Sequence, residues 1–148
     1  MRRKKIYSTD FSIDVSSGKE SEIFKWFLAC LLFGKPIRQE VARRTYFEFQ
    51  EAGLLTPEKI LKAGWGKLVK ILDKGHYVRY DFSTTTKLLE ICRRLKEKYG
   101  SIGKLLAESK NENELNKKIL EFKGIGPITA RIFLRDLKKI PPRRTEIN

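Results

Sequence analysis

Residues able to do chemistry gather near the C-terminus, where two glycines flank one apolar residue between two helical patterns. Segment 119–134 reads ILEFKGIGPITARIFL. Gly124 and Gly126 lack a Cβ atom, so the backbone there can turn sharply and approach another molecule closely. A helix begins directly afterwards, so the amides of Ile125, Gly126 and Ile128 are expected to point outward and, with the helix dipole, to bind one phosphate. The alternative is that the glycines only end one helix and begin the next.

Basic side chains surround this turn. Lys123 stands directly before the first glycine, and Arg131, Arg135 and Lys139 recur every four residues, which places them on one helix face. Three apolar residues fall away from that face: Ile128, Ile132 and Leu137. We expect them to pack inward. The chain has 32 Lys and Arg against 18 Asp and Glu, a formal charge of +14, which favours a polyanionic partner such as nucleic acid or an acidic membrane surface.

The composition argues against several kinds of catalytic and metal site. With one histidine, His76, a zinc hydrolase with paired histidines or a Ser-His-Asp triad built elsewhere in the chain is not expected. Cys30 and Cys92 are too few for a disulfide framework or for a four-cysteine zinc or iron–sulfur site. No apolar run approaches the ~20 residues of a membrane span, and none follows the basic start as in a signal peptide. We therefore expect a cytoplasmic protein, without a membrane segment, iron–sulfur cluster or other resident cofactor.

Helical patterns bounded by caps and by glycine or proline stops fill residues 20–140. Up to eight helices are expected. The first begins at Ser21, its expected N-cap, and ends near Gly34; the others cover Pro36 to Glu51, 57–63, 67–74, Thr84 to Tyr99, 101–108, 112–122 and 128–139. Apolar residues recur at helical spacing within them, and no alternating run is long enough to predict a sheet. The sequence therefore predicts an all-α domain of seven to eight helices.

The two ends of the chain differ from this middle part. Residues 1–19 are polar and begin with a basic run, so we expect an arm with a short extended piece over 11–15. Residues 141–148 form a Pro- and Arg-rich tail, interpreted as the possible start of a missing segment. The expected organisation is thus one helical domain, 20–140, between an arm and a tail, acting as a monomer. Charged residues make up 34% of the chain, which is typical of thermophile proteins.

Four further residues complete the candidates. Trp26 lies in an apolar helical pattern and is expected in the core, whereas Trp65, between two glycines, is better placed to stack on a base. His76 follows a helix stop and is expected in a loop or in packing. Asp136 has basic neighbours on its own helix and is expected to pair with Arg135 or Lys139.

Three segments resemble one known family. The stretch FKGIGPITARIFL resembles the hairpin of a helix-hairpin-helix motif, L-P-G-[IV]-G-x-x-[TA]-A. Residues 71–100 are similar to the segment before that hairpin in endonuclease III-like proteins, and residues 27–49 to their early helix pair. The resemblance spans roughly residues 20 to 140 and keeps the order of elements. It implies the helix-hairpin-helix/Gly-Pro-Asp superfamily of base-excision DNA glycosylases, which bind duplex DNA, flip out one base and cut its glycosidic bond.

The resemblance also implies roles for individual residues. The amides of Gly124, Ile125 and Gly126 would contact a DNA phosphate, Arg131 would add a contact, and Lys35 would stand at the gap left by the flipped base. The other residues of the expected DNA-binding set are Lys123, Ile128, Thr129 and Arg135. A monovalent cation, which many such hairpins hold, would rest on the backbone carbonyls of Leu120, Phe122 and Ile125.

The chain departs from the family at two catalytic positions. Bifunctional members carry a lysine two residues after the second glycine, where this chain has Ile128. Isoleucine has no amine for a Schiff base, so lyase activity is not expected. The family's catalytic aspartate falls at Glu146, within the tail. A carboxylate there could stabilise charge on the sugar or activate water.

Three functions follow as hypotheses. The first is a monofunctional DNA glycosylase that acts on a damaged base in duplex DNA. The second is a non-catalytic helix-hairpin-helix module, a reduced or truncated glycosylase that only binds DNA. The third is a basic helical domain for RNA or protein partners.

Overall fold

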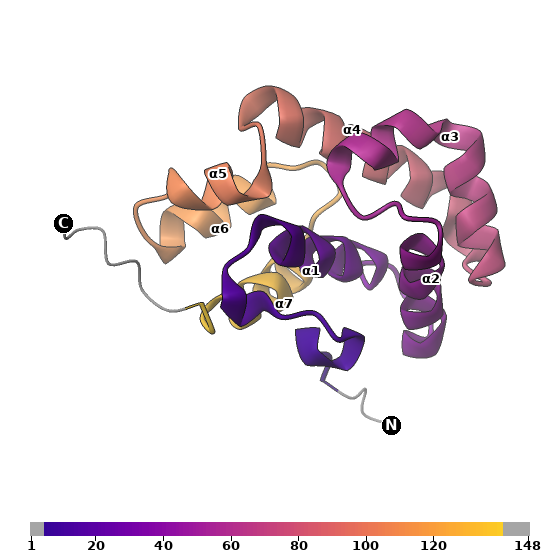
Figure 1. The fold of residues 1–148 in the computed structure, drawn as a ribbon, viewed down its shortest axis with the longest axis horizontal. Coiled ribbons are helices and arrows are strands. Elements are labelled where there is room, and N and C mark those ends of the chain that lie inside the picture. Colours follow the sequence, from indigo (N-terminus) through magenta and orange to yellow (C-terminus); the bar gives the residue numbers. More distant parts are fainter. Residues whose placement is uncertain (1–4, 141–148) are drawn as a thin grey trace.

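The computed structural model describes residues 5–140, and every regular element in this range is a helix (Figure 1). The α-helices are α1 (Glu20–Leu32), α2 (Gln39–Glu51), α3 (Pro57–Lys74), α4 (Asp81–Lys98), α5 (Ile102–Ala107), α6 (Glu112–Leu120) and α7 (Pro127–Leu137). Three short 3-10 helices accompany them: η1 (Ser8–Phe11), η2 (Val15–Ser17) and η3 (Val78–Tyr80). The predicted all-α class is confirmed.

Local capping explains where several helices begin. The hydroxyl of Thr56 accepts a hydrogen bond from the Lys59 amide at 3.1 Å, and Pro57 occupies the first helical position, as predicted. Ser101 and Asn111 cap α5 and α6 in the same way. Each cap satisfies an amide that the helix itself leaves without a partner.

Two predicted helix starts are wrong. Helix α1 begins at Glu20, so Ser21 lies inside it, and the N-cap position is occupied by Lys19 without a side-chain cap. Helix α2 begins at Gln39 and not at Pro36. The amide of Ile37 donates to the Lys35 carbonyl at 2.8 Å, a turn too tight for helical backbone.

Helix α3 combines the two short helices predicted over 57–63 and 67–74. Its backbone leaves helical geometry at Gly64, where φ is +82° and ψ is 171°. This left-handed φ is strained for residues with a Cβ atom, and glycine adopts it freely. The glycine therefore breaks the helix at the predicted place, but the second part follows without an intervening loop.

Helix α1 lies at the centre of the core, against α2, α5 and α7 (Figure 1). Nine of its thirteen residues are buried, so it is apolar nearly all round. Trp26 is fully buried, as predicted, and its indole N–H donates to the Phe133 carbonyl in α7 at 3.2 Å. Helices α3 and α4 form an antiparallel pair beside this centre.

The N-terminal segment corrects the expected arm. Phe11, Ile13 and Val15 are each at most 2% exposed, and their neighbours form η1 and η2 in place of the expected extended piece over 11–15. Phe11 packs edge-on against Tyr46, with ring centroids 5.3 Å apart. Residues 1–19 are polar on average, but three of their apolar side chains are buried in the core. The folded unit therefore begins before residue 20. The first four residues and the tail 141–148 lie outside the described range.

Phe11→Ala should therefore destabilise the whole fold. Removing a buried phenylalanine side chain costs about 3–5 kcal/mol, because transfer energy is lost and a cavity is left. Chemical denaturation monitored by circular dichroism measures this change. Phe82→Ala is the matched control, since Phe82 is 59% exposed. Equal stability losses in the two variants would show that the segment is a dispensable arm after all.

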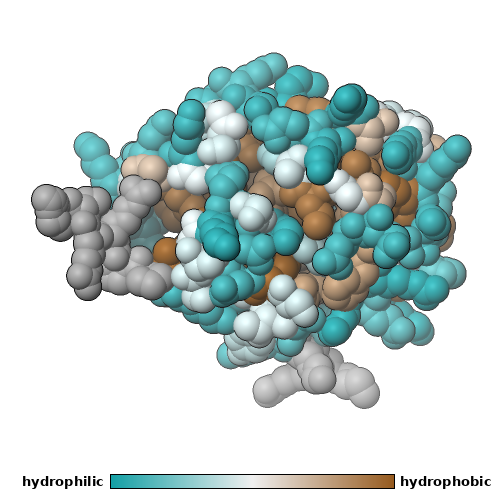
Figure 2. Space-filling view, in the orientation of Figure 1, coloured by the Kyte–Doolittle hydropathy of each residue, from teal (hydrophilic) through white to brown (hydrophobic). Residues whose placement is uncertain are grey.

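The face of the molecule seen in the orientation of Figure 1 is mostly hydrophilic. Figure 2 shows hydrophilic residues over most of one face, with hydrophobic residues visible in the gaps between them. Among residues 5–140 no helix is both long enough and apolar enough to cross a membrane.

Candidate nucleic-acid interface

The turn between α6 and α7 exposes its two glycines. Phe122 and Ile125 are buried at 2% and 6% exposure and anchor the turn in the core, whereas Gly124 and Gly126 are exposed. Gly124 has a φ of +98°, and Gly126 has extended backbone with φ −95° and ψ 177°. A Cβ atom built on Gly126 would meet no other atom within 4 Å. The fold thus holds the turn from inside and leaves its backbone open outside.

The free amides of this turn differ in part from those expected. The amide of Ile125 donates to the Phe122 carbonyl at 3.1 Å, so its predicted role as a phosphate donor is wrong. The amides of Gly126 and Ile128 donate to no acceptor among residues 5–140, and the same holds for Gly124 and Thr129. Pro127 contributes no N–H. Open donors therefore remain at the start of α7, where the helix dipole favours an anion.

The faces of α7 are arranged differently from the prediction. Ala130, Phe133 and Asp136 form the buried side. Ile128 precedes Ala130 by two residues, about 200° round the helix, and is 65% exposed, so its predicted inward packing is wrong. Ile132 and Leu137 are partly buried against the core, as expected. The exposed side of α7 next to the turn thus carries Ile128 together with the exposed Arg131.

Arg135 is engaged within the protein. Its Nε donates to Asp136 at 2.9 Å, its guanidinium also donates to the Ile6 carbonyl, and it lies 4.3 Å from the centre of the Tyr7 ring. Asp136 further pairs with Lys139 at 3.7 Å, so the predicted pairing of this carboxylate is confirmed. Of the three basic residues predicted to share one face, Arg131 alone forms no ion pair among the described residues. Arg135 instead fastens the N-terminal segment to α7.

The carbonyls expected to hold a cation are only partly free. The Phe122 carbonyl accepts the Ile125 amide, whereas the carbonyls of Leu120 and Ile125 accept no hydrogen bond within residues 5–140. A monovalent cation at this place stays a prediction. Among the same residues no group of three or more His, Cys, Asp or Glu side chains could hold a metal ion.

The loop between α1 and α2 lies beside the turn. A Cβ atom built on Gly34 would stand 3.2 Å from the Thr129 hydroxyl and 3.2 Å from the Lys87 ammonium. Lys35 follows in the same loop, with its ammonium 5.3 Å from the centre of the Tyr80 ring. The structure therefore brings together Lys35, Thr129 and the glycine turn. It adds Lys87 on α4, which the sequence analysis missed.

Lys87 is the titratable group whose surroundings are most unusual in this region. Burial, and secondarily the charge of Lys35, lowers its pKa to about 8. Its neighbours in sequence, Thr84 and Leu88, are both buried. In the sequence, the distinguishing feature of Lys87 is that it stands directly before Leu88, a core residue. Lysines beside core residues commonly extend to solvent, so this position does not indicate a functional role.

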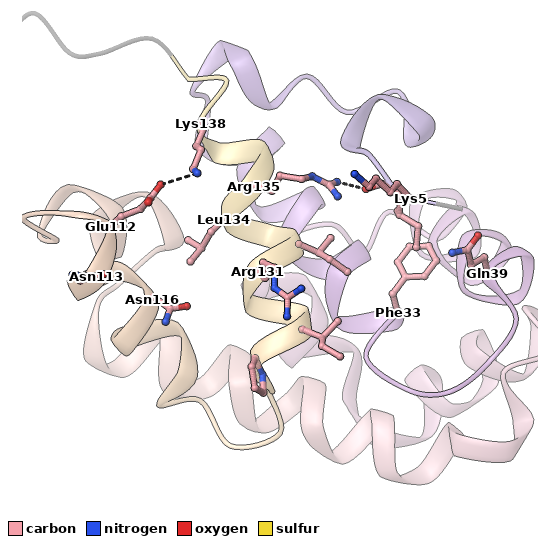
Figure 3. A pocket seen from close by; sticks show the side chains of 14 residues that line it. Lys5, Phe33, Gln39, Glu112, Asn113, Asn116, Arg131, Leu134, Arg135 and Lys138 are labelled. Carbon is pink, nitrogen blue, oxygen red and sulfur yellow. Dashed lines mark hydrogen bonds and ion pairs between the residues drawn. The ribbon is translucent and has the colours of Figure 1, made fainter. Parts of the chain in front are cut away.

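A cleft of about 870 Å³ runs along the exposed side of α7 (Figure 3). Asn113 and Asn116 on α6 face Arg131 on α7 across it. Ile128, in the first turn of α7, also lines the cleft. Glu112, the carboxylate that lines this cleft among the described residues, pairs with Lys138 at 3.6 Å. Glu146, the predicted catalytic residue, lies outside the described range. The cleft thus offers amides and a guanidinium that could bind a base, but no free carboxylate from residues 5–140.

Trp65, His76 and Lys123 are the remaining candidates. Trp65 is 44% exposed and packs against Phe82 with ring centroids 4.9 Å apart. His76 is exposed in the loop after α3, with a φ of +69°. Lys123 is exposed in the turn itself and forms no ion pair among the described residues.

Comparisons of this chain with models of protein families, with curated proteins and with solved structures found no match.

Proposed function

We propose that this protein binds duplex DNA and grips one backbone phosphate at the turn between α6 and α7. The observation that supports this most is the pair of open amides at Gly126 and Ile128, next to an exposed glycine whose Cβ position is empty. A phosphate needs donors of this kind and space to approach them. Lys35, Lys123 and Arg131 add positive charge around the same turn, and the chain as a whole carries +14. Duplex DNA presents phosphates in regular rows, which suits such a surface.

The activity we propose for this interface is base excision by a monofunctional DNA glycosylase. Pro127 and Ile128, which directly follow the glycine turn, line the cleft along α7, so a base flipped out beside the bound phosphate would have this cleft next to it. Its amide groups, from Asn113 and Asn116, can hydrogen-bond to the edge of a base. Isoleucine at 128 supplies no amine, so the proposed reaction is hydrolysis of the glycosidic bond without cleavage of the strand.

A non-catalytic DNA-binding module is the second candidate. This candidate is favoured because the described carboxylates near the cleft are already engaged in ion pairs. Glu112 is paired with Lys138, and Asp136 is buried under Ser8, Arg135 and Lys139. Neither is free to activate water, and the candidate that remains from the sequence for this role is Glu146.

A panel of duplexes, each with one damaged base, tests both candidates. The glycosylase proposal predicts loss of one class of damaged base, with strand breaks that appear only after alkali. Breaks without alkali would contradict the monofunctional reaction. Tight binding to all duplexes with no excision would identify the non-catalytic module. Tighter binding to structured RNA than to duplex DNA of the same length would contradict both candidates.

A further inference from the structure

A second cleft lies beside the glycine turn, between α4 and two loops. Its lining includes three lysines, two residues with hydroxyl groups and one carboxylate: Lys35, Lys87, Lys123, Ser83, Thr86 and Glu90. The lysines come from three separate elements: the loop after α1, helix α4 and the turn after α6. Because like charges repel, the presence of three lysines in the lining of one cleft costs free energy unless an anion balances their charge.

Lys87 is built into the wall of this cleft. Its side chain passes so close over Gly124 that a Cβ atom there would lie 2.7 Å from the Lys87 Cδ. The ammonium ends beside Gly34 and donates to the Leu31 carbonyl at a long 3.4 Å. An ammonium carries three donors, and no further acceptor or ion-pair partner is present among residues 5–140. This half-buried cation therefore has too few partners in the protein alone.

The acidic side chain in the cleft does not balance these charges. Glu90 forms its ion pair with Arg93, on the same helix. The Lys35 ammonium lies 5.3 Å from the centre of the Tyr80 ring, and Lys123 is exposed and forms no ion pair among the described residues. Ser83 and Thr86 lie on the cleft side of α4, where their hydroxyl groups can donate to an anion. The arrangement has the charge and the donors that a phosphate group requires.

We propose that this cleft is a second phosphate-binding site, in which Lys35, Lys87 and Lys123 surround one phosphate group of a DNA strand. The site deepens the proposed function and rests on it for the identity of the strand. It is separate from the amides of Gly126 and Ile128, because its ligands are side chains from α4 and the two loops. The phosphate is either an internal phosphodiester or the monoester at a strand end, and the two share this chemistry.

Binding at this site should depend on pH. Lys87 must be charged to bind a phosphate, and its pKa of about 8 in the free protein means that it loses its proton in mildly alkaline solution. The charged groups that line the same cleft are Lys35, Lys123 and Glu90, while α1 and α7 contribute a carbonyl and the Thr129 hydroxyl, which do not titrate. A bound phosphate favours the charged form, so the protein should take up a proton on binding, and affinity should fall above about pH 8.

Inorganic phosphate tests the cleft without DNA. Nuclear magnetic resonance should show saturable shifts at the amides of Gly34 and Gly124 with phosphate, and no such shifts with chloride at equal ionic strength. The pKa of Lys87, followed at its Cε, should rise when phosphate is present. Lys87→Gln should abolish the shifts, and Lys104→Gln, an exposed lysine on α5, should keep them. Shifts that are absent, spread evenly over the exposed lysines, or kept in Lys87→Gln would overturn the proposal.

Three duplexes then identify the source of the phosphate. One is intact, one has a nick with a 5′-phosphate, and one has the same nick with a 5′-hydroxyl. Lys87→Gln should weaken binding about 10-fold or more, the usual worth of one charge-assisted hydrogen bond. An equal loss on all three duplexes identifies an internal phosphodiester, and a loss confined to the 5′-phosphate identifies a strand end. Unchanged binding to all three overturns the site.

Two further comparisons keep these outcomes separate. Removal of an underpaired buried charge should not lower stability, so the thermal midpoint of Lys87→Gln should be equal to that of the wild type or higher. If this variant fails to fold, Lys35→Gln serves the same tests.

If the protein binds inorganic phosphate in the cleft but no DNA, the proposed function fails and the anion site stands. If Gly126→Val weakens DNA binding and Lys87→Gln does not, the cleft fails and the proposed function stands.

Discussion

Gly126→Val is expected to weaken binding to duplex DNA by about 10- to 100-fold, the worth of one lost charge-assisted hydrogen bond or more. The valine side chain would occupy the space in front of the open amides, where the proposed phosphate lies. The fold itself should tolerate the change. The backbone at Gly126 is extended, no atom lies within 4 Å of its Cβ position, and no side chain caps the helix there. The free energy of unfolding should stay within about 0.5 kcal/mol of the wild type.

Gly66→Val is the matched control for this experiment. Gly66 also has open space at its Cβ position, but it lies in α3, away from the turn. Fluorescence anisotropy with a labelled duplex over a series of salt concentrations measures both variants. Affinity should fall for Gly126→Val and stay unchanged for Gly66→Val, while the slope of log affinity against log salt should stay nearly the same in both variants, because neither change removes a cation. Equal affinity of Gly126→Val and wild type would remove the phosphate contact from the proposed function.

The two glycines of the turn have different physical reasons to be glycine. Gly124 has a left-handed φ and supports the side chain of Lys87, so any Cβ atom there strains the backbone and displaces the lysine. At Gly126 the backbone is extended and not left-handed, and no atom lies within 4 Å of the Cβ position. A substitution at Gly124 therefore disturbs folding and the second cleft together, whereas Gly126 isolates access to the backbone. The motif in the sequence does not separate these two roles.

Features of the fold that depend on local interactions could be predicted from the sequence. The Thr56–Pro57 start of α3 and the break at Gly64 involve residues within a few positions of each other. The predicted starts of α1 and α2 were wrong by a few residues: α1 begins at Glu20, and a tight turn closed by the Ile37 amide and the Lys35 carbonyl delays α2 to Gln39. The N-terminal arm was wrong for a non-local reason, since Phe11 gains its burial from residues such as Tyr46, 35 positions away.

The candidate site shows the same limit. Lys123, Gly124, Gly126 and Arg131 lie close in sequence, and the structure keeps them together around the turn. The amide of Ile125 could not be judged from the motif, because its partner depends on how the turn closes. Lys87 could not be found at all, since the Leu31 carbonyl that it contacts lies 56 positions earlier in the chain. Such contacts are set by the packing of α1, α4 and the turn.

Asp136→Asn should cause the largest loss of stability among the polar substitutions proposed for this chain. The carboxylate is 1% exposed and accepts the Ser8 amide at 2.7 Å, in addition to its pairs with Arg135 and Lys139. It therefore fastens the N-terminal segment to α7 from inside. Loss of a hydrogen bond to a charged group costs about 1.5–3 kcal/mol, and the figure is not larger here because the side chains of Arg135 and Lys139 are 32% and 42% exposed and stay solvated. Urea denaturation should show this loss, and Asp73→Asn, at an exposed position on α3, should show almost none.

The loss should also depend on pH, and the direction follows from the pKa of Asp136. Burial alone would raise this pKa, but the hydrogen bond from the Ser8 amide and the hydrogen bond and charge of Arg135 outweigh burial and hold the pKa below its ordinary value. A carboxyl group with a lowered pKa stabilises the folded state above its unfolded pKa of about 3.9, and this contribution disappears as the pH falls through the folded pKa. The gap between wild type and Asp136→Asn should therefore be full near neutral pH and should narrow in acid. A gap that stays constant down to low pH would mean that shape, and not the charge of Asp136, holds the N-terminal segment in place.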